Sequence, residues 1–62
     1  MIVKLMDSLA GVPVYVNPAY VMTLRPDPVD PTRVTVLKLR DGETISVRGD
    51  HEEVAGKLAG TP

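Results

Sequence analysis

The sequence predicts an α+β fold that is mostly β: a small twisted antiparallel sheet of about five short strands with one C-terminal helix. Several short runs alternate apolar with other residues, which is the period of a half-buried strand, and turn-forming residues separate these runs. Beyond Gly49 the apolar spacing becomes helical, and Asp50 stands where an N-cap is expected. A chain of 62 residues is long enough for a single small domain, residues 1–62.

The first two strands are expected at residues 2–6 and 12–16. Val3 and Leu5 point to one face of the first run, and Val14 and Val16 to one face of the second. The turn-forming segment DSLAG lies between the two runs. These strands are therefore expected to pair as a hairpin.

Two proline-containing segments flank the third strand, which is expected at residues 20–25. Asn17-Pro18 predicts a corner, because proline has no N–H for a ladder and asparagine can accept a hydrogen bond from its own local backbone. The segment Pro26–Pro31, PDPVDP, holds too many prolines for a central strand or a helix. It is expected to be a stiff, solvated loop.

The last two strands are expected at residues 33–39 and 43–48, joined around Asp41-Gly42. A three-residue loop with Gly42 in the left-handed conformation sets Leu37 opposite Ile45. A two-residue loop would set apolar residues opposite polar ones, so the sequence favours the longer loop.

A helix is expected at residues 51–59. Asp50 and Glu53 have the spacing of a capping box. Val54 and Leu58 form a narrow apolar stripe, and Gly60 is a suitable stop. Such a short helix depends on packing against the sheet for its stability.

The predicted core is small, since a chain of this length buries only about 60% of its unfolded surface. With no cysteine and a single histidine, the chain has no disulfide, and a closed zinc site would lack its usual ligands. Val34 and Val36 fall on the face of the second hairpin that the core does not use. We therefore expect a homo-oligomer with these two valines in its interface.

The charge and hydropathy of the chain do not favour a nucleic-acid or membrane partner. A net charge of -1 gives no long-range field, so it implies neither a nucleic acid nor a membrane. No apolar run reaches the roughly 18 residues of a membrane span. Residues 1–6 are too short for a signal peptide. The sequence predicts a cytoplasmic protein without a membrane partner.

No residues have the pattern of a catalytic or cofactor site. Ser8 and Ser46 lie in no recognisable nucleophile context beside the sole histidine, His51. The acidic residues around His51 are explained by the start of a helix. The glycines do not have the spacing of a phosphate-binding loop. We expect no enzymatic activity, no cofactor and no metal.

Two segments are candidate contacts for a protein partner, because loops on a rigid scaffold carry most recognition. They are the proline-rich loop and the tip of the second hairpin, with Pro26, Asp27, Pro28, Val29, Arg40, Asp41 and Glu43. The alternative is a nucleic-acid or nucleotide-binding module in which a sheet gathers basic side chains near Tyr15 or Tyr20 for base stacking. Its basic residues would be Arg25, Arg33, Lys38, Arg40 and Arg48.

The whole pattern resembles the small FlbD-like family of bacterial flagellar and swarming-motility proteins. The residues that carry the resemblance are Tyr15-Val16-Asn17-Pro18, Thr35-Val36, Asp41-Gly42 and Glu53-Val54, spread over nearly the full chain. The segment from Arg25 to Arg33 departs from it, being longer and richer in proline. The resemblance implies an association with motility and no enzymatic activity. We expect a self-associating regulatory module that binds a protein. The alternative, a nucleic-acid or nucleotide-binding module, includes a phage-encoded protein that acts on its host or sequesters a ligand.

Overall fold

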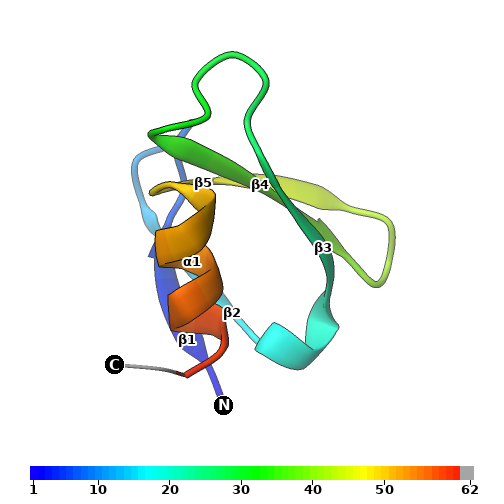
Figure 1. The fold of residues 1–62 in the computed structure, drawn as a ribbon. Coiled ribbons are helices and arrows are strands. Elements are labelled where there is room, and N and C mark those ends of the chain that lie inside the picture. Colours follow the sequence, from blue (N-terminus) through cyan, green and yellow to red (C-terminus); the bar gives the residue numbers. More distant parts are fainter. Residues whose placement is uncertain (61–62) are drawn as a thin grey trace.

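The computed structural model describes residues 1–60 and has the predicted class, α+β and mostly β (Figure 1). In chain order its elements are β1 (Val3–Met6), β2 (Pro13–Val16), the 3₁₀ turn η1 (Pro18–Tyr20), β3 (Val21–Pro26), β4 (Val34–Leu39), β5 (Thr44–Arg48) and α1 (His51–Leu58). The predicted strands and helix are present, and their bounds differ from the predicted ones by at most one residue at either end.

The strands form two antiparallel sheets, whereas the sequence predicted one. β1 pairs with β2, and the second sheet has the order β3-β4-β5. An isolated bridge between Asp7 and Val47 joins the sheets. The ladder stops there because the chain turns on both sides of the bridge. The Asp7 carboxylate accepts hydrogen bonds from the amides of Leu9 and Ala10 at 2.8 and 2.9 Å, and Gly49, at a φ of 115°, turns the chain toward α1.

The β4–β5 hairpin has the predicted register and loop. Leu37 lies opposite Ile45. Gly42 has a φ of 90°, and its N–H donates to the Leu39 carbonyl at 3.0 Å. The Leu39 N–H donates to the Glu43 carbonyl at 2.8 Å and closes a three-residue loop. The pairing of apolar with apolar residues therefore identified the turn correctly.

β3 differs from the predicted third strand in two ways. It extends to Pro26, which lies opposite Thr35, so the first proline belongs to the strand and not to the loop. A bulge between Val21 and Thr23 also shifts the register. Val21 consequently packs against the core while Met22 is exposed. An extra residue in a bulged strand breaks the alternation on which the sequence-based assignment of faces depends.

Prolines stand on the outer edges of both sheets. Val12 accepts a hydrogen bond across the first hairpin through its carbonyl, and Asp27 donates one across to β4 through its N–H. Because the direction of these bonds alternates along a strand, the neighbouring Pro13 and Pro26 face away from their ladders. Neither proline costs its sheet a bond, and each removes a donor that a foreign strand could use.

The core lies between the two sheets and α1. Its buried apolar side chains are Leu5, Val16, Leu37, Val47 and Val54. Thr35 is the buried polar residue beside them, and its hydroxyl donates to the Gly49 carbonyl at 2.9 Å. The small number of buried side chains agrees with the thin core that the chain length implies.

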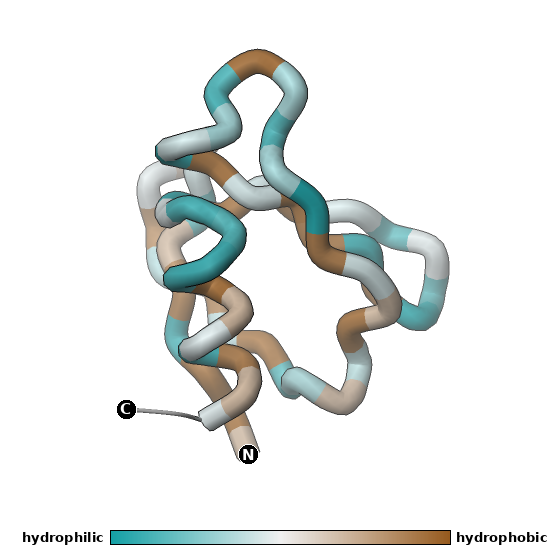
Figure 2. Tube along the Cα trace, in the orientation of Figure 1, coloured by the Kyte–Doolittle hydropathy of each residue, from teal (hydrophilic) through white to brown (hydrophobic). Residues whose placement is uncertain are grey.

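The helix α1 begins as predicted. The Asp50 carboxylate accepts a hydrogen bond from the Glu53 N–H at 2.8 Å, which satisfies one of the free amides of the first turn. Figure 2 shows that this first turn is hydrophilic and that more apolar residues follow it. Val54 of the next turn is fully buried, so it anchors the helix on the sheets.

Candidate functional site

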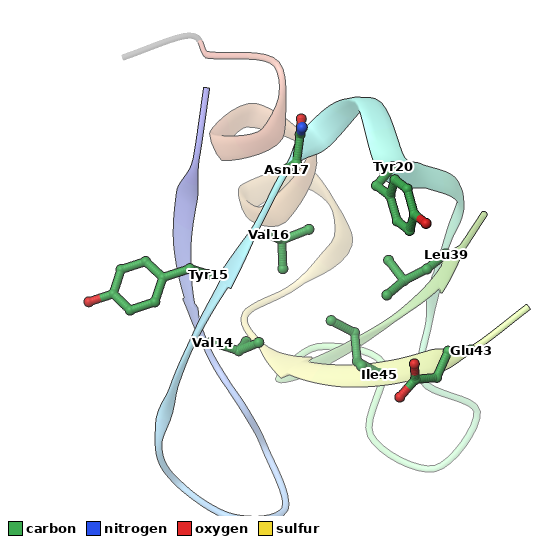
Figure 3. A pocket seen from close by; sticks show the side chains of 8 residues that line it. All are labelled: Val14, Tyr15, Val16, Asn17, Tyr20, Leu39, Glu43 and Ile45. Atoms are coloured by element: carbon green, nitrogen blue, oxygen red, sulfur yellow. The ribbon is translucent and has the colours of Figure 1, made fainter. Parts of the chain in front are cut away.

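An apolar hollow opens between β2, η1 and the β4–β5 hairpin (Figure 3). Its volume is about 300 Å³. We call it the hollow, and its lining residues are Val14, Tyr15, Val16, Asn17, Tyr20, Leu39, Glu43 and Ile45. Residues of both sheets line it.

The side chains around the hollow point in different directions. In Figure 3 Val16, Leu39 and Ile45 point toward one another across it, and the ring of Tyr20 lies beside Leu39. The ring of Tyr15 points away. Both tyrosines are exposed, at 64% for Tyr15 and 47% for Tyr20. The aromatic wall of the hollow is therefore Tyr20.

The corner after β2 places Tyr20 at the hollow. The Asn17 side chain accepts a hydrogen bond from the Ala19 N–H at 3.0 Å, and Pro18 starts the 3₁₀ turn. The Arg40 N–H donates to the Tyr20 carbonyl at 2.9 Å. The predicted corner is confirmed, and this bond to the hairpin tip fixes its position against β4.

The lining of the hollow is mostly apolar. Of its eight lining residues, Glu43 alone has a carboxylate side chain. Within residues 1–60 the Glu43 carboxylate takes part in no ion pair. The lining holds no serine, cysteine, lysine or histidine. The hollow suits an apolar group with a positive charge beside it.

A second surface lies on the opposite side of the β3-β4-β5 sheet. Thr23, Arg25, Val36, Lys38 and Thr44 line a shallow depression of about 180 Å³. The register adds Val34, Ser46 and Arg48 to the same face, because alternate residues of β4 and β5 share a side. We call these eight residues the outer face.

Three of the basic residues predicted as nucleic-acid contacts meet on the outer face. Arg25, Lys38 and Arg48 are exposed and form no ion pair or side-chain hydrogen bond with the part of the chain described here. The ion pair found in that part joins Glu53 and Lys57 at 4.0 Å on α1.

The remaining residues of that prediction lie elsewhere. Arg33 and Arg40 stand at opposite ends of β4, outside the strand. Tyr15 and Tyr20 belong to β2 and η1, so no aromatic side chain is part of the outer face. Three of the five predicted basic residues therefore share one face, and the two tyrosines lie away from it.

The two segments predicted as protein contacts are not brought together. β4 separates the proline-rich loop from the hairpin tip by its full length, about 20 Å for a strand of this size. In the loop the Asp27 carboxylate accepts hydrogen bonds from the amides of Val29 and Asp30, both at 2.9 Å. Val29 is 90% exposed at the loop tip. The hairpin tip contributes Glu43 to the hollow, whereas Pro26, Pro28, Arg40 and Asp41 are not among its lining residues.

Backbone hydrogen bonds stabilise the charged form of the Asp7 carboxyl group. Hydrogen bonds from the Ala10 and Leu9 backbone amides lower the pKa of its carboxyl below the ordinary value. Both bonds close the turn between β1 and β2, so this carboxylate has a structural role.

Known proteins give this chain no family, and its described residues hold no metal cluster. No protein-family model, curated protein or solved structure matches this chain. Over residues 1–60, no three acidic, histidine or cysteine side chains gather as a metal site would require. None of the helices there is long and apolar enough to cross a membrane. The resemblance to the FlbD-like family stays a prediction.

Sequence analysis missed the hollow. The alternation of β2, β4 and β5 correctly gives Val14, Val16, Leu39 and Ile45 an inward direction. The alternation does not show that the strands form two separate sheets with a hollow between them. The sequence feature that could have indicated the hollow is Tyr20, a large side chain shortly after the predicted corner at Asn17-Pro18.

Proposed function

We propose that this protein is a non-enzymatic cytoplasmic module that binds a protein partner through the hollow and also self-associates. The observation that carries the proposal is an open apolar hollow of about 300 Å³ with a single charged residue, Glu43, in its lining. A cleft of this kind can bury one large apolar side chain of a partner. The resemblance to motility-associated FlbD-like proteins supports a regulatory role.

The expected partner segment has an apolar anchor next to a lysine or arginine. The anchor would displace water from Val16, Leu39 and Ile45, and the basic group would meet the unpaired Glu43 carboxylate. The ring of Tyr20 would cover one side of the anchor.

Tyr20→Ala is expected to weaken partner binding by about tenfold, because the ring covers one side of the anchor and truncating such an aromatic contact costs roughly 1–2 kcal/mol. Peptides that bind the folded protein would be selected from a displayed random library, and their affinities measured by calorimetry. Tyr15→Ala is the matched control, since this exposed tyrosine points away from the hollow. Selected peptides that tolerate Tyr20→Ala as well as Tyr15→Ala would refute the hollow as the site.

Self-association is expected to appear as a solution mass above the 6.7 kDa of one chain, rising with concentration in light-scattering measurements. The thin core favours additional burial against a second copy. If Val34 and Val36 form that interface around a two-fold axis, the cations of the two outer faces approach each other. Association should then strengthen with added salt, which screens this repulsion. A constant 6.7 kDa mass at every concentration would remove self-association from the proposal.

A further inference from the structure

We propose that the outer face is a second binding surface, and that it takes an acidic protein segment in which apolar residues alternate with glutamate or aspartate. This surface is on the other side of the sheet from the hollow and does not depend on binding at the hollow. It includes Val34 and Val36, so an acidic segment would compete with a second copy of the chain for the same face. It is the one place in residues 1–60 where three unpaired cations share a face with half-buried valines.

The sheet register fixes the arrangement of the cations. Arg25 lies directly across from Val36, and Lys38 follows Val36 by two residues along β4. Neighbouring strands are about 4.8 Å apart, so the two basic side chains stand diagonally next to each other on the same face. Arg48 is opposite Val34 at the other end. Its guanidinium lies against the turn at Gly11, so it borders the surface rather than fills its centre.

The charge of the face is local and open to a ligand. The whole chain carries a net charge of -1. The local excess of positive charge on the outer face is therefore produced by the fold and not by the composition. The carboxylate nearest to Arg25 in the sequence is that of Asp27 in the following loop, and it already accepts two amide hydrogen bonds from that loop. Carboxylates of a partner can therefore pair with Arg25 and Lys38 without displacing an internal ion pair.

The centre of the face favours a protein segment over a nucleic acid. Val34 and Val36 are half-buried and offer apolar contact between the cations. Single-stranded nucleic acids gain much of their affinity by stacking bases on aromatic rings, and the outer face has no such ring. An extended acidic segment with alternate apolar residues can use both features, since its side chains alternate with a period of two.

The test uses a fluorescent peptide that alternates glutamate with leucine, titrated with the protein at low and moderate salt. We expect Arg25→Glu and Lys38→Glu each to weaken binding by about tenfold, because a partner carboxylate then meets a like charge. Arg33→Glu changes the net charge equally but lies outside the outer face, and it should change the affinity less than about twofold. Tyr20→Ala, which damages the hollow, should leave this binding intact.

A second pair of measurements tests the apolar part. Val36→Thr keeps the shape of the side chain and should weaken the glutamate–leucine peptide by about threefold. The same variant should not affect a peptide that alternates glutamate with serine. A thymidine oligonucleotide is also titrated. If it binds more tightly than either peptide and Lys38→Glu abolishes its binding, the ligand is a nucleic acid and the acidic-segment proposal is wrong. Equal losses in Lys38→Glu and Arg33→Glu would show that only net charge matters and would overturn the proposal.

Discussion

Leu37→Ala is expected to remove most of the stability of the fold. Leu37 is fully buried in the central strand β4, with Leu24 of β3 on one side and Ile45 of β5 on the other. Replacing a buried leucine by alanine costs about 2–5 kcal/mol, from lost transfer free energy and the cavity that remains. A domain of this size has a total stability of roughly 3–9 kcal/mol.

The measurement is urea unfolding followed by circular dichroism, with Leu9→Ala as the control. Leu9 is 89% exposed in the turn after β1, so the same substitution there should change the free energy of unfolding by less than about 0.5 kcal/mol. Similar midpoints for the two variants would mean that Leu37 is not at the centre of the core. If the protein self-associates, the comparison must be made at one protein concentration, since the midpoint then depends on it.

The features that sequence analysis predicted well are local in the chain. The register that sets Leu37 opposite Ile45 follows from an apolar pattern on either side of Gly42. The start of α1 follows from Asp50 and the residues just after it. In both cases the residues that interact are close in sequence, so a few side chains are enough to specify the structure.

The features it missed depend on contacts between distant segments. The division into two sheets follows from the bridge between Asp7 and Val47, which are far apart in the chain. The bulge at Met22 depends on how β3 meets β4, and it overrides the alternation that would have buried this residue. Neither can be read from the period of a single strand.

The candidate surfaces show the same division. Grouping Arg25 with Lys38 requires only that two strands be neighbours in the right register, and sequence analysis placed both in its basic set. The hollow requires the angle between two sheets, which no local pattern contains. Tyr20 was considered for base stacking, whereas its position beside Leu39 makes it a wall of that hollow.

Gly49→Ala is the second substitution expected to have a large effect. Gly49 has a φ of 115°, where an L side chain is strained by about 1–3 kcal/mol. The backbone cannot relax easily, because the Gly49 N–H donates to the Arg33 carbonyl at 2.7 Å and its carbonyl accepts from the buried Thr35 hydroxyl. A Cβ here would also lie 2.7 Å from the Glu53 carboxylate and 3.3 Å from a methyl carbon of Val54.

Gly42→Ala separates the backbone strain from the steric contact that an added Cβ makes with α1. Gly42 has a φ of 90° and nothing within 4 Å of an added Cβ, so it reports the backbone strain alone. We expect Gly49→Ala to lower the free energy of unfolding by about 1–2 kcal/mol more than Gly42→Ala, since Val54 is fully buried and has little room to move. Adding Glu53→Ala should recover only part of that difference, because the Glu53 side chain is flexible and can already swing away. Equal losses at the two glycines would show that the contact with α1 contributes nothing and that strain alone explains the requirement for glycine.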